Sequence, residues 1–381
     1  MKKLIRITTV PSSLRSLLKG QHRFMNRYYK VIGVSSAGDA LDEVAQNEGI
    51  NTHAIEMTRS ITPFKDLKSL YQLYTFFKQE KPFIVHTHTP KAGTLGMLAA
   101  KLAGVPHRLH TVAGLPLLET TGIKRKLLDV VEKATYACAT EVLPNSLGLK
   151  KIILEQQYTS IEKIKIIANG SSNGIDVTHY DSALVTVTTK TQLKADLGIT
   201  ENDTVFIFIG RLVKDKGVNE LVAAFNKLSQ QNNHVKLLLI GHKDSQLNPI
   251  HKSTQNLISQ NQHILELGVQ YDIRPYVAIA HILTFPSYRE GFPNVVLQAS
   301  CMNLPCIVSD INGCNEIITH NKNGIIIPPK NTQVLTDAMI YLLKMPEIRL
   351  KMTQHARANI IKNYEQKHVW EALLTHYNTL K

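Results

Sequence analysis

Short apolar runs alternate with helix-length segments along this chain, and this alternation constrains the fold more than any other feature. Runs such as KLIRITT and FIVHTH read as strands, whereas the segments at 65–80 and 91–103 have the length and pattern of helices. A second series of the same kind starts at 204. Strands that alternate with helices predict a mostly parallel sheet with helices on both faces. A chain of 381 residues is long enough for two such domains.

The predicted strands of the first series are KLIRITT, YKVIGVSS, THAIEM, FIVHTH, HRLHTV, TEVLPN and IKIIANG, and those of the second are TVFIFIG, VKLLLIG, ILELG, HILTFPS, PCIVSD and GIIIPP. A turn-rich stretch at about 168–200 lies between them and is interpreted as a linker. We therefore predict an α/β protein with two Rossmann-like, doubly wound parallel-sheet domains, at 1–180 and 195–365. A helix at about 366–381 is expected to pack back on the first domain. Because open parallel sheets bind ligands beyond the carboxyl ends of their strands, we expect the two domains to face an interdomain cleft.

Several classes of protein are excluded by what the sequence lacks. No apolar stretch approaches the roughly eighteen residues of a transmembrane helix. Arg6 within MKKLIRITTV and Pro11 directly after it leave no apolar run long enough for a signal peptide, so this segment is predicted to be the first strand. The four cysteines form no C-x-x-C motif, and three of them lie in or beside apolar segments, which indicates buried thiols in a reducing cytoplasm. G-x-G-x-x-G, the P-loop and Asp-x-Asp are all missing, so we expect any phosphate to be held without a metal or cofactor.

The positive charge of the chain is concentrated in its first half. The net charge is +14; residues 1–180 hold 24 Lys and Arg against 14 Asp and Glu, and residues 181–381 hold 20 against 16. This asymmetry predicts an anionic partner for the first half, whether lipid, nucleic acid or a phosphorylated substrate. A generally basic proteome is the alternative explanation.

FIGRLVKDKG (208–217) has the features of an anion-binding loop after a strand. Gly210 ends the strand and lets the chain pass close to a ligand, and Arg211 and Lys216 stand across a turn from each other, where both can reach one anion. A solvated basic loop is the alternative.

SYREGFPNVVLQAS (287–300) is a second candidate anion site. Gly291, Phe292 and Asn294 lead into a predicted helix, and the first N–H groups of a helix attract phosphate. An ordinary turn capped by Asn294 is the alternative. Because the two loops follow different strands of one predicted sheet, together they suggest a clamp for a diphosphate.

Three histidines end adjacent predicted strands of the first domain. His86 and His88 alternate along one strand and therefore share a face, with Lys91 just beyond, and His110 ends the next strand. No third metal ligand is evident. Lone histidines are more often structural, but this grouping at strand ends predicts that they face the cleft and that His110 is functional.

Residues 12–28 combine apolar positions at helical spacing with Arg15, Lys19 and Arg23, and Lys124 and Arg125 form a second basic cluster. Such a basic amphipathic segment suits an anionic membrane surface or a lipid-linked phosphate. A first helix with a solvated basic face is the alternative. Aromatic residues are not interleaved with the basic runs, which disfavours nucleic acid as the partner.

The motifs VHTHTPKAG, HTVAGLP, NGSSNGID, GRLVKDKG, SYREGFPNVVLQ and GCNEII together resemble glycosyltransferase family 4, closely over about 85–330 and in outline over the whole chain. The resemblance implies the GT-B fold and retaining transfer of a hexose from a UDP-sugar, without a metal. HTHTPKAG followed by HTVAGLP is most similar to the branch that extends undecaprenyl-diphosphate-linked sugars in bacterial surface-glycan assembly, with N-acetylgalactosamine as the sugar in some members. It implies a cytoplasmic enzyme, peripheral on the inner membrane face, with an acceptor-binding first domain and a nucleotide-sugar-binding second domain. Within the first domain we expect His88 and Lys91 to contact the acceptor.

The resemblance also implies roles for individual residues. It places Arg211 and Lys216 on the donor diphosphate, Glu290 on the donor sugar or phosphate, and His110 beside the reacting sugar. At the second glutamate of the family's E-x7-E motif this chain has Gln298, which loses charge assistance to the ribose hydroxyls at a cost of roughly 1 kcal/mol. The backbone positions implied to hold phosphate are Gly291 and Phe292, and those implied to hold the base are Gly268 and Val269.

Two other functions stay open from the sequence. A hydrolysing UDP-sugar epimerase uses the same two-domain layout. A non-catalytic partner that binds a nucleotide or polyanion is the second alternative, because the substitution at Gln298 is of the kind found in degenerate sites. The donor sugar, the acceptor, the linkage and the oligomeric state are not encoded in any motif that we identify.

Overall fold

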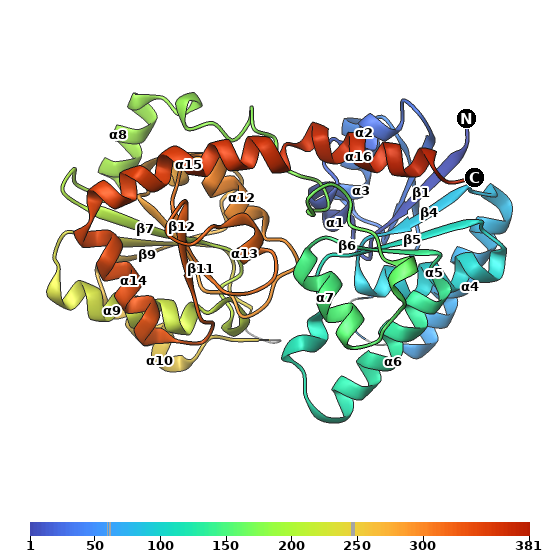
Figure 1. The fold of residues 1–381 in the computed structure, drawn as a ribbon, viewed down its shortest axis with the longest axis horizontal. Coiled ribbons are helices and arrows are strands. Elements are labelled where there is room, and N and C mark those ends of the chain that lie inside the picture. Colours follow the sequence, from blue (N-terminus) through green and yellow to red (C-terminus); the bar gives the residue numbers. More distant parts are fainter. Residues whose placement is uncertain (59, 61, 245–247) are drawn as a thin grey trace. The chain divides into compact units, whose positions relative to one another are not determined.

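The computed structural model describes residues 1–58, 60, 62–244 and 248–381. The chain forms two compact units (Figure 1). Unit 1 comprises Met1–Gly174 together with Gln366–Lys381, and unit 2 comprises Ile175–Glu365. Each unit contains one six-stranded parallel sheet, so the predicted class of fold is confirmed. Within the described residues, no helix combines the length and the apolar character needed to cross a lipid bilayer.

The sheet of unit 1 is formed by β1 (Lys3–Ile7), β2 (Lys30–Ser35), β3 (Asn51–Ala54), β4 (Ile84–Thr87), β5 (His107–Val112) and β6 (Glu141–Pro144). The strands are parallel in the order β3-β2-β1-β4-β5-β6. Because β1 pairs with both β2 and β4, the order reverses beside β1, which makes this the point where doubly wound sheets bind ligands. The register sets Arg6 opposite His86 and Thr87 opposite His110.

Alternate residues of these strands enter two separate cores, one on each face of the sheet. Leu4, Ile84 and Leu109 pack on the face covered by the first group of helices, and Ile5 and Val85 pack on the opposite face. The first group is α1 (Pro11–Leu17), α2 (Gln21–Met25), α3 (Asp39–Glu48) and α16 (Gln366–Asn378). The second group is α4 (Pro63–Glu80), α5 (Pro90–Ala103), α6 (Gly122–Cys138) and α7 (Leu147–Glu155), with the short 3-10 helices η1 (Pro116–Glu119) and η2 (Ile161–Lys163) nearby in the chain.

Two predictions about the segment between the sheets are wrong. IKIIANG is not a strand, because the chain there makes a single bridge, between Val142 and Ile164, and does not extend the sheet. The stretch at 168–200 is not a plain linker, since it contains η3 (Ser182–Leu184) and α8 (Val187–Asp196). Ile175 is buried in the core of unit 2, so burial of apolar side chains fixes much of this stretch.

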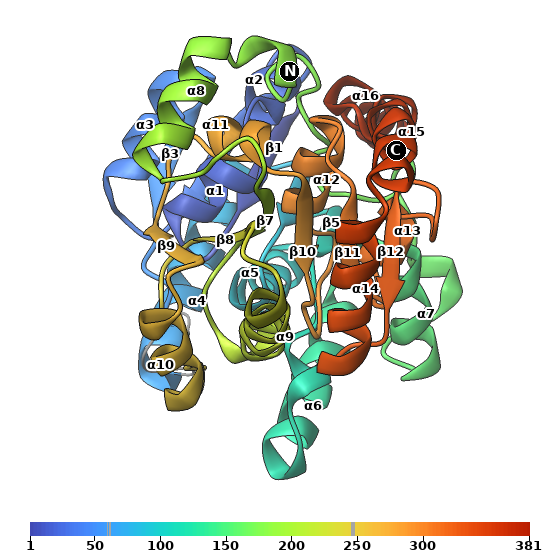
Figure 2. The same cartoon turned by 90° about the vertical axis from the view of Figure 1, so that its left-hand side faces the viewer.

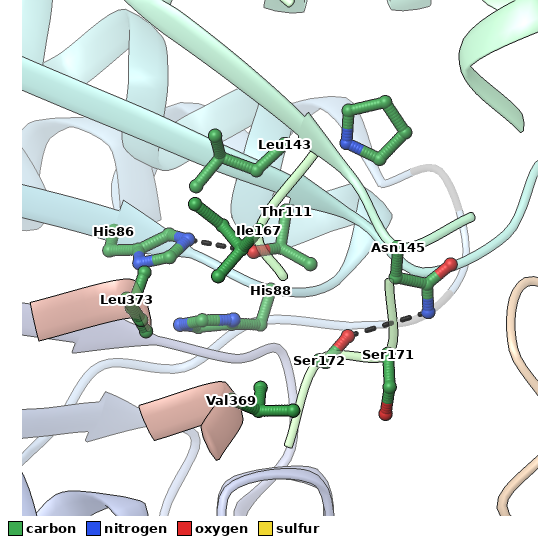
Figure 3. A pocket seen from close by; sticks show the side chains of 11 residues that line it. His86, His88, Thr111, Leu143, Asn145, Ile167, Ser171, Ser172, Val369 and Leu373 are labelled. Atoms are coloured by element: carbon green, nitrogen blue, oxygen red, sulfur yellow. Dashed lines mark hydrogen bonds between the residues drawn. The ribbon is translucent and has the colours of Figure 1, made fainter. Parts of the chain in front are cut away.

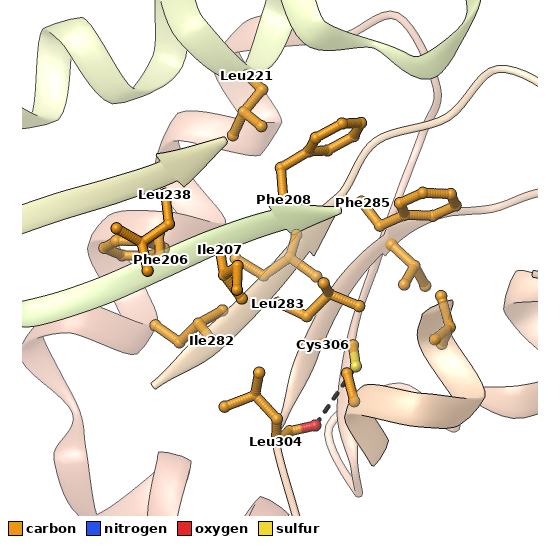
Figure 4. Packing of buried hydrophobic residues seen from close by; sticks show 14 of the residues in the cluster. Phe206, Ile207, Phe208, Leu221, Leu238, Ile282, Leu283, Phe285, Leu304 and Cys306 are labelled. Carbon is orange, nitrogen blue, oxygen red and sulfur yellow. Dashed lines mark hydrogen bonds between the residues drawn. The ribbon is translucent and has the colours of Figure 1, made fainter. Parts of the chain in front are cut away.

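The sheet of unit 2 is formed by β7 (Thr204–Ile209), β8 (Val235–Ile240), β9 (Ile264–Gly268), β10 (Ile282–Phe285), β11 (Cys306–Ser309) and β12 (Gly324–Ile327). They are parallel in the order β12-β11-β10-β7-β8-β9. The central strands are buried on both faces, as Figure 4 shows, and the rings of Phe208 and Phe285 stack with centroids 5.9 Å apart. Besides η3 and α8, the helices of unit 2 are η4 (Lys214–Lys216), α9 (Val218–Gln231), α10 (Lys252–Gln260), α11 (Arg274–Ile279), α12 (Asn294–Cys301), α13 (Cys314–Ile317), α14 (Thr332–Lys344) and α15 (Pro346–Tyr364).

Candidate active site

Lys216 and Glu290 meet in an ion pair beyond two adjacent strands of unit 2. Lys216 ends η4, which follows β7, and Glu290 lies in the loop after β10. The ammonium group of Lys216 donates to Oε1 of Glu290, and the Ser287 hydroxyl donates to the same oxygen at 2.8 Å. Both charged side chains are largely buried, at 17% and 14% exposure. Lys216 and Glu290, which were predicted from separate motifs, therefore form one ion pair, in which the cation neutralises the carboxylate.

A glycine makes this meeting possible. Gly217 has a φ of 69° and begins the turn into α9. A Cβ at this position would lie 2.0 Å from the carbonyl oxygen of Pro286, which is too close for any other residue type. The backbone after β7 therefore passes directly against the end of β10, and this close approach brings Lys216 to Glu290.

Arg211 lies on the same loop but has a different partner. Its guanidinium is 3.9 Å from a carboxylate oxygen of Asp244, and its side chain is 41% exposed. Arg211 is thus more open to solvent than Lys216, and its pairing is of the weak, solvent-screened kind. Gly210 precedes it with a φ of 154°, at the end of β7.

The loop Gly291–Pro293 leads into α12, as predicted. The alternative explanation, a turn capped by Asn294, is wrong. Asn294 is the first residue of the helix, the N-cap is Pro293, and no side chain caps the helix. Asn294 therefore does not occupy the helix start as a cap, and α12 keeps the N-terminal dipole that favours an anion. The Phe292 side chain is buried against the Tyr364 ring, at 5.2 Å between centroids, so only its backbone is available to a ligand.

Asn312 is a further residue of the site, and no sequence motif predicts it. Its amide Nδ2 donates to the backbone carbonyl of Glu290, and a weaker contact of 3.4 Å reaches the carbonyl of Gly291. These contacts fix the loop that carries the carboxylate. Asn312 lies just before the motif GCNEII, and only the folded chain brings it to Glu290.

Gln298 lies one helical turn after Asn294 on α12 and is half-buried. Its amide nitrogen donates to the hydroxyl oxygen of Tyr180 at 2.8 Å. The pKa of Tyr180 is raised, chiefly by burial, which keeps the phenol protonated. The amide of Gln298 is therefore turned so that its nitrogen has a partner within the protein.

The two residues implied to hold the base lie at the end of β9. Gly268 has a φ of 65°, and its carbonyl accepts a hydrogen bond from the Gly241 amide at 2.8 Å. Val269 follows it and is exposed. Both residues thus belong to the same strand-end edge of the unit 2 sheet as the Lys216–Glu290 pair.

In unit 1, His110 is a buried and neutral histidine. Its Nδ1 is 2.7 Å from the Thr87 hydroxyl, and the ring lies against Gly93 of α5, where a Cβ would come within 2.4 Å of it. Burial lowers the pKa of His110 to about 4, against a smaller upward effect of a hydrogen bond at Thr87. At neutral pH the ring therefore carries no charge.

His86 and His88 share a face, as predicted, but His110 is not on it. The rings of His86 and His88 lie 4.1 Å apart on the α16 side of the sheet, whereas His110 faces α5. The predicted grouping of three histidines is wrong, because the register places His110 beside Thr87 and not beside His86.

His86 belongs to a buried chain of polar groups. Nη2 of Arg6 donates to the Tyr377 hydroxyl at 3.1 Å, and that oxygen is 2.5 Å from Nδ1 of His86. Nε2 of His86 lies 2.7 Å from the Thr111 hydroxyl (Figure 3). Because an arginine can only donate, the Tyr377 oxygen accepts from Arg6, and its hydroxyl hydrogen is available for Nδ1 of His86. Burial, and then Arg6, lowers the pKa of His86 well below its usual value.

His88 lines a small cavity in unit 1. The cavity has a volume of about 20 Å³, and His88, Asn145 and Leu373 are among its walls (Figure 3). This is space for about one water molecule and not for a saccharide. His88 is 3% exposed, and Lys91 is held by Asp66 at 2.5 Å, so neither predicted acceptor contact is open in this structure.

The two basic clusters predicted to face a membrane or acceptor lie on opposite faces of the unit 1 sheet. Arg15 and Lys19 are on and just after α1, and Arg23 is on α2, whereas Lys124 and Arg125 are on α6. Arg15 pairs with Glu43 at 2.6 Å, and Arg23 donates to the carbonyl of Asn47. Arg125 pairs with Asp129 at 2.9 Å. The two clusters therefore lie on different sides of unit 1.

Two parallel sheets with cationic and anionic side chains at the strand ends of the second are the features of the GT-B class of sugar-transferring enzymes. Comparison with known proteins agrees with this class. The family model "Glycosyl transferase 4-like" matches residues 17–146, and "Glycosyl transferases group 1" matches residues 189–359.

Among characterised sequences, the capsular polysaccharide biosynthesis glycosyltransferase CapM of Staphylococcus aureus is 30% identical over 99% of this chain and 97% of its own length. An Escherichia coli UDP-Gal:alpha-D-GlcNAc-diphosphoundecaprenol alpha-1,3-galactosyltransferase is 31% identical, over 81% of this chain and 78% of its own. Among solved structures, Anabaena HepE in complex with UDP-glucose superposes with a TM-score of 0.81 at 17% identity, with 100% of both chains covered. The chain belongs to glycosyltransferase family 4 and is an enzyme.

Proposed function

We propose that this glycosyltransferase moves a hexose, specifically an N-acetylhexosamine, from a UDP-sugar to an undecaprenyl-diphosphate-linked saccharide in bacterial surface-glycan assembly. The configuration at the anomeric carbon is retained, no metal takes part, and the reaction occurs on the cytoplasmic face of the inner membrane. Unit 1 binds the acceptor and unit 2 binds the nucleotide sugar.

The names of two relatives support the acceptor. The E. coli relative acts on a diphosphoundecaprenol-linked sugar, and the Campylobacter jejuni relative is an N,N'-diacetylbacillosaminyl-diphospho-undecaprenol alpha-1,3-N-acetylgalactosaminyltransferase, 27% identical over 89% of both chains. Within the described residues, no group of three or more His, Cys, Asp or Glu side chains could hold a metal ion. The donor diphosphate therefore has Lys216, Arg211 and the start of α12 as its candidate binding groups.

The ion pair between Lys216 and Glu290 is the observation that carries the proposal. A diphosphate arriving at the end of β7 attracts the Lys216 ammonium group, which must turn from Glu290 to meet it. The carboxylate of Glu290 then loses the ammonium group but keeps the Ser287 hydroxyl, which donates to the same oxygen, Oε1. That carboxylate can accept hydrogen bonds from the donor sugar's hydroxyls. One donor molecule, with phosphates and hydroxyls together, satisfies both partners of the separated pair.

The transfer requires charge to move onto the leaving UDP as the bond to the anomeric carbon breaks. Lys216, Arg211 and the α12 dipole stabilise that charge in the transition state. Buried and neutral His110 suits hydrogen bonding to a sugar and does not add a positive charge that would oppose an oxocarbenium-like transition state.

The decisive experiment combines a panel of UDP-sugars with short-chain polyprenyl-diphosphate-linked saccharides and analyses the products by mass spectrometry. We expect a mass gain of one N-acetylhexosamine on the lipid-linked acceptor, and NMR of the product should show the donor's anomeric configuration. Transfer to lipid-free saccharides alone would overturn the acceptor assignment. Net conversion of UDP-N-acetylglucosamine to its epimer without acceptor would favour the epimerase instead.

The non-catalytic alternative has its own test. If the chain only binds a nucleotide, Arg211→Ala and Lys216→Ala variants expressed in cells should support full glycan assembly. We expect both variants to lose it, at protein levels equal to those of the parent chain.

A further inference from the structure

Helix α6 presents an apolar stripe to solvent. Ile123, Leu127 and Val130 recur at helical spacing and are exposed, Ile123 at 87% and Val130 at 63%. The opposite side of the helix packs inward through Thr135 and Tyr136, which are buried. The side chains of the stripe therefore do not contribute to the core of unit 1. In Figure 2 the N-terminal part of α6, which carries Ile123, projects away from the rest of unit 1.

The charges on α6 are sorted between its two sides. Lys124, Lys126 and Lys133 are exposed, and at 100° per residue they border the stripe. The two acids of the helix turn toward the protein: Asp129 binds Arg125 and the Tyr158 hydroxyl, and the pKa of Glu132 is raised, chiefly by burial. The solvent side of α6 thus carries apolar groups and positive charge, with no exposed acid.

Helix α4 repeats this pattern. Phe64, Leu67 and Tyr71 are exposed at helical spacing, Phe64 at 91%, and Lys65 and Lys68 are exposed beside them. The single acid in the first half of α4, Asp66, is bound to Lys91. Both α4 and α6 pack against α5, on the same face of the unit 1 sheet. The two stripes therefore belong to one face.

We propose that the exposed side of α4 and α6 docks on an anionic lipid bilayer. The apolar side chains enter the boundary between headgroups and acyl chains, and the bordering lysines contact lipid phosphates. The two helices carry exposed lysines and no exposed acid, which fits an anionic lipid surface. A contact with a second copy of this basic chain would not require the absence of acids. The inference deepens the proposed function, since a lipid-linked acceptor lies in such a surface. It assigns the contact to the α4–α6 face and not to Arg15, Lys19 and Arg23 on the other face.

The test is cosedimentation of the full chain with vesicles of phosphatidylglycerol and phosphatidylethanolamine. We expect Leu127→Ser with Val130→Ser to weaken binding at least tenfold, and Lys126→Glu with Lys133→Glu to do the same at low salt. The matched controls carry equal changes elsewhere: Val187→Ser with Leu350→Ser for the exposed apolar pair, and Arg27→Glu with Lys30→Glu for the charge reversal. We expect both controls to bind as the parent chain does.

Three outcomes would overturn the proposal. These are equal loss in the controls, equal binding to neutral phosphatidylcholine vesicles, or a dimer in sedimentation that the Leu127 and Val130 substitutions dissociate, which would make this face a contact between copies. Transfer to a short-chain acceptor in detergent should remain within twofold of the parent in all four variants. That readout separates failure of membrane docking from failure of the proposed function, which would remove transfer in the parent chain as well.

Discussion

The two units share one type of sheet but use its polar side chains in different ways. In unit 2, Lys216 in η4 and Glu290 in the loop after β10 lie beyond the strand ends and form an ion pair. In unit 1, Arg6 and His86 lie within the strands, enclosed between sheet and helices. A polar group beyond a strand stays within reach of a ligand, whereas one inside a strand must find its partners in the protein. Similar positions in the sequence pattern thus serve binding in one unit and packing in the other.

The largest effect that we expect is at low pH, where unit 1 should lose stability before unit 2. Burial lowers the pKa of His22 to about 3 and of His110 to about 4, and it also lowers the pKa values of His86 and His88 well below the usual value. Above about pH 6.5 these groups are neutral in both the folded and the unfolded chain. Below that pH the unfolded chain takes up protons that the folded chain cannot, so stability falls by up to about 1.4 kcal/mol per pH unit for each histidine.

Hydrogen–deuterium exchange at pH 7 and pH 5 checks this expectation. Peptides from unit 1 should lose protection before those from unit 2, where burial lowers the pKa of His281 to about 4. Simultaneous loss in both units, or earlier loss in unit 2, would break the comparison.

Lys216→Ala should have the largest effect on activity. The substitution removes a cation from the leaving diphosphate, and the loss of one such group commonly lowers kcat by about 10²–10³-fold. Steady-state kinetics with the donor and a short-chain acceptor measures the change, and Lys227→Ala, an exposed lysine of the same unit, is the control. An effect below threefold would mean that the ion pair with Glu290 is structural.

Tyr377→Phe in unit 1 should lower stability and leave activity nearly unchanged. It removes the hydroxyl that joins Arg6 to His86, so the free energy of unfolding should fall by about 1–3 kcal/mol while kcat/KM stays within twofold. Denaturant unfolding and kinetics are measured on the same preparation, with the exposed Tyr341→Phe as control. A variant of normal stability and low activity would place this buried chain in the active site.

Gln298→Glu should have the smallest effect. If Gln298 contacts the donor ribose, a carboxylate there accepts stronger hydrogen bonds, and UDP should bind about fivefold more tightly, or roughly 1 kcal/mol. Calorimetric titration with UDP measures it, and Gln260→Glu on the exposed side of α10 controls for added charge. Unchanged or weaker binding would show that the bond to Tyr180, and not the ligand, sets the role of Gln298.

The sequence predicted the sheets well because buried parallel strands are continuous apolar runs such as TVFIFI. It failed at IKIIANG, where an apolar run lies beside the last strand without pairing along it. The grouping of His86 with His110 failed for a subtler reason. Alternation gives the face of each residue within its own strand, but the register between strands, here Thr87 opposite His110, comes from the packing of the whole unit.

In the candidate site, too, the sequence predicts some residues but not the contacts between them. Lys216 and Glu290 could be named from sequence because each follows a recognisable strand and turn. Their ion pair could not, since it depends on the contact between Gly217 and Pro286. Asn312 carries no local signal at all.

The position of α16 has a consequence for synthesis of the chain. Leu373 and Tyr377 are core residues of unit 1, yet they follow the whole of unit 2 in the sequence. A ribosome therefore delivers the first sheet long before the residues that close one of its faces, whereas unit 2 is complete once Glu365 has emerged. The usual order, in which the amino-terminal domain finishes folding first, is reversed for this protein. Until its last helix arrives, the nascent first unit holds Arg6 and its neighbouring histidines open to water.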